Sequence, residues 1–281
     1  MADIKLFVCC HQPVTVSKQP LLFPVQVGAA LAEARFPGFA YDDEGDNISA
    51  KNRSYCELTA QYWAWKNVEA DYYGFFHYRR YLYPNVSVKQ PYRIEREPDE
   101  ATLNKLGYSR FDKLIRQYDL IIPKGEDMHV SVREHYAAAP NHQVKDLALI
   151  EEIIAERHPE MVRAMNEYLR GTVNYFGNIF IMRRPVFEEY CAWLFPILEE
   201  FDRRADLTGY NAQALRVDGY QAERLLGVYY AHRRAQLRTL ELPRVHFHSG
   251  WDYAKRQALS FLFPPGTLQR AIVKAARRRI G

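Results

Sequence analysis

The chain has 281 residues, of which 48% are hydrophobic and 26% are charged, and its formal net charge is +4. This composition is typical of a globular protein with a sizeable core, in one large domain or one and a half, and it excludes a collagen-like or disordered chain. Nucleic acid is not an expected partner, because the charge is mild, the basic residues are scattered and no RNA-binding signature is present.

The cysteines and the apolar runs indicate the cellular compartment. The four cysteines, Cys9, Cys10, Cys56 and Cys191, show neither zinc-site nor CxxC spacing, which favours a reducing compartment. We recognise no secretory leader before the first predicted strand, and no apolar stretch has membrane-spanning length. We therefore expect a cytoplasmic protein.

The predicted elements alternate between strands and helices. In chain order they are a strand at 4–10, a loop with Pro20 and Pro24, a polar loop at 41–49, a helix at 55–69, an aromatic strand from 70, a loop with a short helix at 84–109, a strand at 119–123, a helix at 146–169 broken at Pro159, a strand within 174–183, helices at 186–202 and 219–234, and a strand at 236–242. Strands interleaved with helices of ten or more residues predict an α/β fold with a mostly parallel sheet.

The aromatic strand ends in His77-Tyr78-Arg79-Arg80. Charged groups are almost never fully buried without partners, and ligands of open α/β sheets bind beyond the carboxyl ends of the strands. The planar guanidinium suits phosphate oxygens, so the arginine pair indicates an anion-binding cleft. The alternative is an arginine pair satisfied by nearby carboxylates at a strand end.

Four segments match, in order, the motifs of one bacterial family. They are 46–52 with 57–67, 74–81, 178–182 and 219–226. Over roughly residues 3–245 the chain resembles the capsular and exopolysaccharide glycosyltransferases long catalogued as a domain of unknown function, some of which resemble galactofuranosyltransferases. That family is similar to nucleotide-diphospho-sugar transferases, so the resemblance implies a GT-A-like, Rossmann-type α/β sandwich whose mostly parallel central sheet is flanked by helices.

The resemblance implies an enzyme that moves a hexosyl group, galactosyl or galactofuranosyl, from a UDP-linked sugar to a glycan or lipid-linked acceptor in surface polysaccharide synthesis. In most GT-A enzymes a D-x-D pair on the corresponding strand holds a divalent metal. Here His77-Tyr78-Arg79 stands in that place, with no carboxylate between Asp71 and Glu95. We therefore predict that no metal is required and that Arg79 and Arg80 stabilise the leaving diphosphate.

Several further residues are predicted on the donor side. Following the resemblance, we expect the donor to contact Cys10, His11, Asp46, Asn47, Lys51, His77, Tyr78, Arg79, Arg80 and Asn178. An alternative for Asn47 is a helix cap. The carboxylates at 42–46 would also suit a metal, but they lack the spacing of a calcium loop, and a solvated loop is the commoner outcome.

A carboxylate is required to deprotonate the acceptor hydroxyl in an inverting transfer. Glu223 is the first choice and Asp218 the second, because both flank the start of the helix that carries the Gly-Tyr-x-x-Glu-Arg motif. The alternative for Glu223 is an ordinary surface ion pair with Arg224. Glu57 needs no functional role, since the helix dipole alone favours it there. We expect acceptor binding by Asn141, His142 and Asp146, with helix capping as the alternative for His142.

The residues after the predicted transferase domain (1–250) form a tail at 251–281. Within it, 267–280 has the pattern of a basic amphipathic helix, with Leu268, Ala271, Ile272 and Ala275 on one face and basic residues, Arg270 among them, around it. Such helices lie on anionic membranes, which predicts peripheral attachment to the inner face of the cell membrane. The alternative is a basic tail that aids solubility. Just before the tail, His246 and His248 could bind a metal or lie on the surface.

A second class of function fits the same residues. A non-catalytic α/β protein could use the arginine pair to bind phosphate or a glycan without turnover. Release of UDP from a UDP-sugar distinguishes the enzyme from the binding protein.

Overall fold

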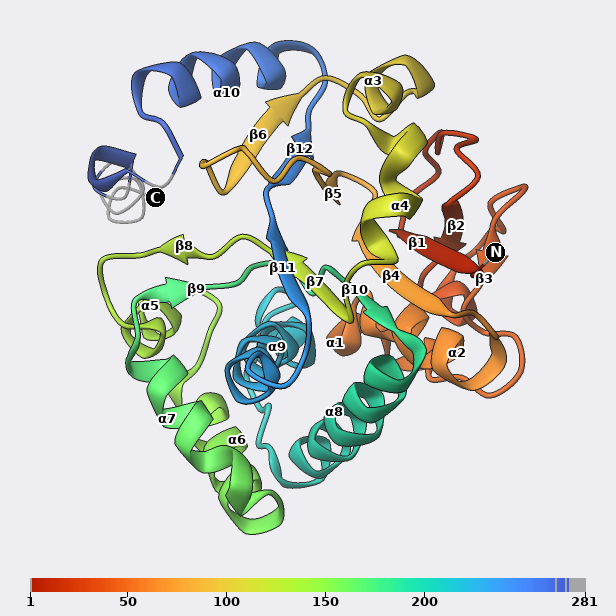
Figure 1. Ribbon diagram of the computed structural model, residues 1–281. Coiled ribbons are helices and arrows are strands. Elements are labelled where there is room, and N and C mark those ends of the chain that lie inside the picture. Colours follow the sequence, from red (N-terminus) through yellow and green to blue (C-terminus); the bar gives the residue numbers. More distant parts are fainter. Residues whose placement is uncertain (1, 266, 271, 273–281) are drawn as a thin grey trace.

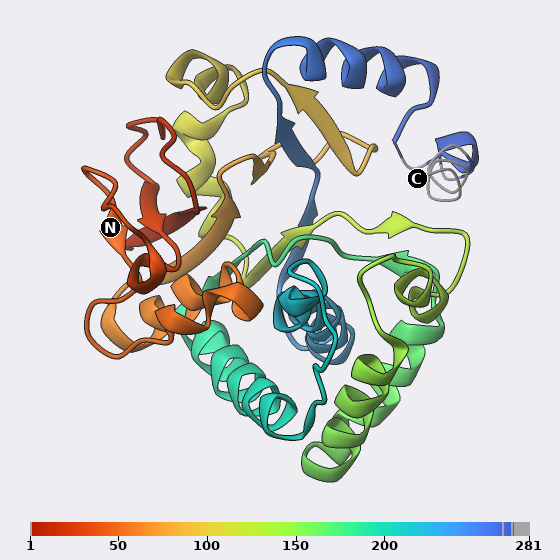
Figure 2. The ribbon, with the colours of Figure 1, turned by 180° about the vertical axis from the view of Figure 1, so that it is seen from behind.

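A computed structural model describes residues 2–265, 267–270 and 272 of the chain. At its centre lies a sheet whose main path has the order β11-β7-β10-β4-β1-β2-β3, with helices on both sides (Figures 1 and 2). The strands of this path are β1 (Ile4–Cys10), β2 (Leu22–Gln26), β3 (Ala40–Tyr41), β4 (Tyr72–His77), β7 (Leu120–Pro123), β10 (Phe180–Arg183) and β11 (Thr239–Leu242).

One antiparallel strand interrupts an otherwise parallel path. β1 pairs in parallel with β2 and β4, β2 with β3, and β7 with β11, whereas β10 runs antiparallel to both β4 and β7. The start of β10 therefore lies at the same edge of the sheet as the ends of β1 and β4. The predicted α/β fold with a mostly parallel sheet is confirmed.

The arginine pair lies where the sheet is extended by three further strands. After β4 the chain turns at residues 78–79 and returns as β5 (Arg80–Leu82), with Arg80 opposite His77. β5 pairs antiparallel with β12 (Arg244–Phe247), which pairs in parallel with β6 (Tyr92–Glu95). A separate pair, β8 (Glu126–Asp127) with β9 (Val173–Asn174), forms a small second sheet.

Alternating side chains of the strands fill two apolar cores. In β1, Phe7 and Cys9 face the larger core, whereas Leu6, Val8 and Cys10 face the smaller one. Helices contributing to the larger core are α1 (Asn52–Tyr55), α2 (Leu58–Asn67), α5 (Val132–Ala137), α6 (Val144–Arg157), α7 (Val162–Arg170), α8 (Arg184–Arg204) and α9 (Val217–Arg233). The smaller core lies under α3 (Glu100–Lys105) and α4 (Phe111–Ile115).

Most of the predicted elements are confirmed, and three differ. The loop predicted around Pro24 contains the strand β2. On one side of β2, β3 pairs only with Val25 and Gln26, so that side is an open edge at Pro24. An edge position tolerates the N–H that proline lacks. The segment 84–109 contains the additional strand β6. The helix predicted at 55–69 is interrupted at Cys56, whose φ of 53° is incompatible with a continuous helix.

Helix α10 (Gly250–Leu262) packs against β6 at the top of the molecule in Figure 1. Its start coincides with the predicted boundary at residue 250, although the division into a domain and a tail stays a prediction. Of the basic helix predicted at 267–280, residues 271 and 273–280 lie outside the described residues. No helix in the described part of the chain has the length and apolar character needed to cross a bilayer.

Candidate active site

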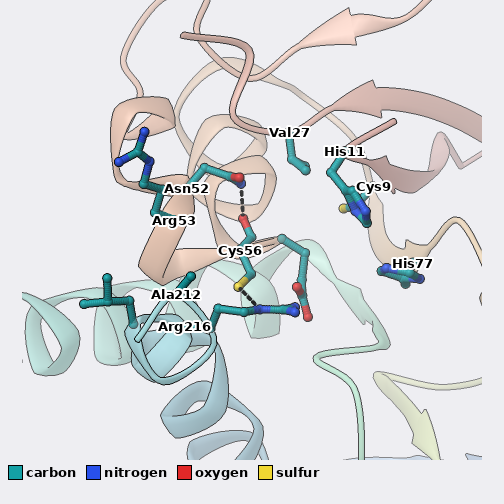
Figure 3. A pocket seen from close by; sticks show the side chains of 11 residues that line it. Cys9, His11, Val27, Asn52, Arg53, Cys56, His77, Ala212 and Arg216 are labelled. Atoms are coloured by element: carbon teal, nitrogen blue, oxygen red, sulfur yellow. Dashed lines mark hydrogen bonds between the residues drawn. The ribbon is translucent and has the colours of Figure 1, made fainter. Parts of the chain in front are cut away.

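A cavity of about 450 Å³ lies beyond the carboxyl ends of β1 and β4. It is bordered by the ends of these strands, by the α1–α2 junction and by the segment that precedes α9. In Figure 3, His11, His77 and Cys9 line one side and Asn52 and Arg53 the other, with Cys56 and Arg216 between them. The remaining lining residues are Val27, Glu57, Ala212 and Leu215. This location agrees with the general position of ligand sites in open α/β sheets.

Two histidines in the cavity experience strong positive potential. Burial, followed by the charges of Arg80, His11, Arg79 and Arg216, lowers the pKa of His77 to about 3. Burial, Arg79 and Arg216 likewise lower the pKa of His11. His77 is therefore neutral at physiological pH, and its Nδ1 accepts a hydrogen bond from the backbone N–H of Arg79 at 3.2 Å.

The guanidinium groups near the cavity lack carboxylate partners. The Arg79 guanidinium lies 4.8 Å from the centre of the Tyr78 ring and donates to the Tyr78 hydroxyl. Among the described residues, no ion pair within 4 Å is formed by Arg53, Arg79, Arg80 or Arg216. Positive charge without a protein counterion favours binding of an anion.

Arg216 was not among the predicted site residues. Its Nε donates to Cys56 Sγ at 3.3 Å, which fixes the guanidinium at the cavity wall. The strained backbone of Cys56 places the thiol there, and burial raises the pKa of Cys56 to about 12. Because Arg216 precedes the Gly219 motif by only three residues, its position next to that motif was the signal available in the sequence.

Glu57 is the carboxylate that lines the cavity. Asn178 Nδ2 donates to Glu57 Oε1 at 3.1 Å and to the Gly219 carbonyl at 3.0 Å. Burial, and to a smaller extent Glu223, raise the pKa of Glu57. A carboxylate with a raised pKa is better matched to proton transfer near neutral pH. We had assigned Glu57 no function, although it begins one of the motifs that carry the family resemblance.

Asn178 itself is held in an unusual conformation. Its φ of 39° lies in the left-handed region, and the side chain is buried at the start of the segment leading into β10. Its Oδ1 has no hydrogen-bond partner within the described part of the chain. A strained, buried residue with an unsatisfied acceptor beside a cavity is consistent with a ligand-binding role. Its predicted contact with the donor sugar stays a prediction.

Glu223 and Asp218, the two predicted bases, have different surroundings. Glu223 Oε2 accepts from the buried Arg224 guanidinium at 2.8 Å, and its charge acts on Glu57 and Arg80. Asp218 is fully buried, faces α1 through a hydrogen bond from the Ser54 hydroxyl, and is not among the residues that line the cavity.

Of the ten predicted donor residues, His11 and His77 line the cavity and the other eight do not. Tyr78, Arg79, Arg80 and Asn178 are next to lining residues in the chain or in contact with them, whereas Cys10, Asp46, Asn47 and Lys51 are engaged elsewhere. The Cys10 thiol is fully buried in the smaller core, so Cys9 is the cysteine of β1 that faces the cavity. Asp46 is exposed and accepts from the Tyr62 hydroxyl at 3.3 Å. Asn47 Oδ1 accepts from the Ser49 N–H at 3.1 Å, and Lys51 forms an ion pair with Asp202 at 2.8 Å.

The predicted acceptor residues cluster at the start of α6. The His142 ring lies between those of Tyr136 and Tyr220, with both centroids at 4.3 Å. Asp146 accepts from the Tyr210 hydroxyl at 2.8 Å, and burial raises its pKa. Asn141 is half-buried on the preceding turn. Tyr220 connects this cluster to the cavity, because its hydroxyl pKa responds to the charges of Arg216 and Glu57 as well as to burial.

The two candidate metal-binding groups are engaged elsewhere. Asp42 is fully buried and accepts from the backbone N–H groups of Gly28 and Ala29 at 2.8 and 2.9 Å. His246 stacks on Tyr92 at 4.5 Å, and His248 Nδ1 lies 2.8 Å from Asp252 Oδ2. The described residues contain no group of three or more histidine, cysteine or carboxylate side chains placed to hold a metal ion.

Comparison with known proteins gives two matches. A family model described as "Domain of unknown function (DUF4422)" matches residues 5–234. The structure is similar to that of the apo WbbM bifunctional glycosyltransferase, with a TM-score of 0.83 and 31% sequence identity over 87% of this chain. The match covers 45% of the WbbM chain, so this chain spans less than half of that protein's length. No curated protein matches the sequence.

Proposed function

This chain belongs to the family described as domain of unknown function DUF4422, and we propose that it is a glycosyltransferase. The predicted resemblance to a glycosyltransferase-related family is confirmed by the family match and by the likeness to WbbM. We propose that the enzyme moves a hexosyl group, galactosyl or galactofuranosyl, from a UDP-linked sugar to a glycan acceptor in bacterial surface polysaccharide synthesis.

One observation carries this proposal: guanidinium groups without carboxylate partners lie around a cavity that also contains a buried carboxylate. Arg79 and Arg216 both lower the pKa values of His11 and His77, so both act on the same space. A nucleoside diphosphate would supply the missing negative charge. As it leaves, the additional charge on its phosphate oxygens would be stabilised by these fixed groups.

The reaction requires one bond to form and one to break. The acceptor hydroxyl oxygen attacks C1 of the donor sugar, and the bond from C1 to the β-phosphate oxygen breaks. The hydroxyl proton passes to the Glu57 carboxylate, and the nucleoside diphosphate leaves with its electron pair beside Arg79, Arg80 and Arg216. A single displacement of this kind inverts the configuration at C1. In this scheme the guanidinium charge takes the role that a divalent metal has in most GT-A enzymes.

We assign the base to Glu57 rather than to Glu223 because of their partners. Glu57 accepts from a neutral amide and lines the cavity, whereas Glu223 shares its oxygen with the Arg224 guanidinium. The Glu223 carboxylate is thus already engaged by a buried arginine, and it is not among the residues that line the cavity. The charge of Glu223 would then serve to keep Glu57 basic.

A donor screen tests the proposal. Nucleotide sugars that bind the folded protein should raise its melting temperature, and a UDP-sugar should release UDP in the presence of an acceptor. Arg79→Ala should lower turnover by roughly 100-fold or more, as expected for loss of a group that stabilises developing charge. Arg163→Ala is the matched control, since Arg163 is an exposed arginine paired only with Glu167.

The outcomes separate enzyme from binding protein. Binding of a nucleotide sugar without turnover on any acceptor would support the alternative of a non-catalytic phosphate- or glycan-binding protein. Equal turnover in Arg79→Ala and Arg163→Ala would contradict the role of the arginine pair.

A further inference from the structure

Helix α10 exposes its apolar side chains. Trp251, Phe261 and Leu262 are 83%, 86% and 67% exposed. Together with Ala254, Lys255 and Ala258, which are also exposed, they recur at intervals of three and four residues. Side chains at this spacing lie on one face of a helix, so α10 presents an apolar stripe to the solvent.

The opposite face of α10 is the one that contacts the protein, and it is polar. Gln257 Nε2 donates to the Ile94 carbonyl of β6 at 3.1 Å and to the Tyr253 hydroxyl at 3.1 Å. The Arg96 guanidinium lies 4.9 Å from the centre of the Tyr253 ring. A helix of a globular protein ordinarily buries its apolar face, so this orientation is reversed. The reversal leaves the apolar stripe uncovered among the described residues, which favours an external partner.

The residues after α10 are fixed beside the same stripe. Arg270 was expected on the exposed basic face, but its side chain is buried and donates to the Leu259 carbonyl at 2.9 Å and to the Tyr92 hydroxyl at 3.1 Å. The predicted place of Arg270 among the basic residues around the apolar face is therefore wrong, because the Leu259 carbonyl of α10 and the Tyr92 hydroxyl of β6 accept hydrogen bonds from its guanidinium. Leu268 and Ile272 remain exposed, which extends the apolar surface beyond α10.

The net positive charge of residues 251–281 favours an anionic partner for the apolar stripe. Residues 251–281 contain seven lysines and arginines and one acidic residue, a net charge of +6, against +4 for the whole chain. The preceding 250 residues are thus slightly acidic, so the positive charge of the protein is concentrated here. The single carboxylate, Asp252, is already engaged by Arg256 and His248, each at 2.8 Å. An apolar stripe that carries the exposed Lys255, in a part of the sequence with a net charge of +6, fits an anionic lipid surface.

We infer that α10, with the exposed residues 268 and 272, is a membrane-docking surface for anionic bilayers. The helix lies parallel to the bilayer, with Trp251 and the Phe261–Leu262 pair inserted at the level of the headgroups and Lys255 extending to the phosphates. This assigns the principal lipid contact to α10, upstream of the basic segment from which the sequence predicted membrane attachment. The inference does not depend on the proposed reaction.

The docking surface is connected to the candidate active site through β12. The Phe247 N–H, three residues before α10, donates to the Arg79 carbonyl at 2.9 Å. Docking would therefore hold the arginine pair at a set distance from the bilayer, which suits an acceptor carried on a lipid.

Vesicle binding tests the inference on the full chain. The probes are phosphatidylcholine vesicles with and without about one third phosphatidylglycerol, at low and high salt. Wild-type protein should sediment with the anionic vesicles, and the fluorescence of Trp251 should shift to shorter wavelength. The other three tryptophans are buried or partly buried, so such a shift would report on Trp251.

One triple variant and one double variant make the test specific. Trp251→Ser with Phe261→Ser and Leu262→Ser should weaken vesicle binding by at least about tenfold. Val86→Ser with Val130→Ser removes exposed apolar side chains elsewhere and should leave binding unchanged. All the substituted side chains are exposed, so the melting temperatures should match that of the wild type.

Three results would overturn the inference. The first is that the wild-type protein does not bind anionic vesicles. The second is that the triple and the double variant lose binding equally. The third is that the wild type binds neutral vesicles at high salt as well as it binds anionic ones. A wild-type dimer that the α10 variant converts to a monomer, with no vesicle binding by either, would identify a second copy of the chain as the partner.

Discussion

Replacing Asp218 by asparagine should stabilise the protein, and increasingly so as the pH rises. Burial, followed by the nearby Asp202 carboxylate, raises the pKa of Asp218 to about 7, from an ordinary value of 3.8. The Ser54 hydroxyl and Lys51 act in the opposite direction without overcoming these effects. The folded state therefore binds a proton that the unfolded chain releases between these two pKa values.

The sign and size of the effect follow from this difference. Between pH 4 and pH 7 the folded state holds more protons than the unfolded state, so wild-type stability falls as the pH rises. The pKa of Asp218 differs from 3.8 to about 7 between the unfolded and folded states, and each pKa unit corresponds to about 1.4 kcal/mol. The loss of unfolding free energy therefore has an upper limit of about 4 kcal/mol. Asparagine has nearly the same shape, can accept from Ser54 and does not ionise. The variant should thus equal the wild type near pH 4 and exceed it by up to about 4 kcal/mol at pH 8.

Urea unfolding followed by circular dichroism at both pH values measures the difference. Asp206→Asn is the control with the opposite sign, because hydrogen bonds from Thr208 lower the pKa of this exposed carboxyl. That variant should lose stability at pH 8 and not at pH 4. A variant Asp218→Asn that is less stable at both values would refute the reasoning. Loss of transfer with the fold intact would instead restore Asp218 as a candidate base.

Three further outcomes are expected. Glu57→Gln should lower turnover by roughly 10²- to 10⁴-fold and leave donor affinity intact. Because burial raises the pKa of Glu57, the same variant should be more stable than the wild type at pH 8. A larger loss of turnover in Glu223→Gln, or a product whose NMR spectrum shows retained configuration, would contradict the assignment of Glu57 as the base. EDTA should leave substantial activity, and complete loss that manganese or magnesium restores would reveal a metal site. Arg216→Ala should weaken UDP binding by about tenfold through loss of one charge-assisted contact, measured by calorimetry, whereas a change confined to turnover would exclude a ground-state role.

The sequence predicted the fold well where periodicity is strong. The apolar run of β1, the aromatic run of β4 and the break at Pro159 all have local causes, and each element formed as expected. β2 and β6 were not predicted, because each is stabilised by pairing with strands from elsewhere in the chain rather than by its own pattern. The interruption at Cys56 likewise depends on tertiary contacts, among them the Arg216–Cys56 hydrogen bond.

The sequence predicted only part of the candidate site, because strand ends can be read from local pattern and the packing of helices cannot. His11, His77 and the arginine pair follow strand ends, whose position in an α/β sheet is general. Glu57 and Arg216 come from helix termini, and their place in the cavity depends on how α1, α2 and α9 pack. Cys10 was predicted as part of the strand end, but it is Cys9 that lines the cavity. Which of two neighbouring side chains faces the ligand depends on which core each one enters, and the strand end alone does not show this.

If the cavity binds the proposed nucleoside diphosphate, the neutral state of His77 would couple that binding to protons. Burial, followed by the charges of Arg80, His11, Arg79 and Arg216, lowers the pKa of His77 and keeps the imidazole uncharged in the free protein. A bound diphosphate would offset that positive potential and raise the affinity of His11 and His77 for protons. Binding would then take up protons from solution, and by reciprocity a lower pH would strengthen it. Calorimetric titration with UDP in buffers of different ionisation enthalpy would measure this uptake as a buffer-dependent heat, and a heat that is the same in all buffers would contradict it.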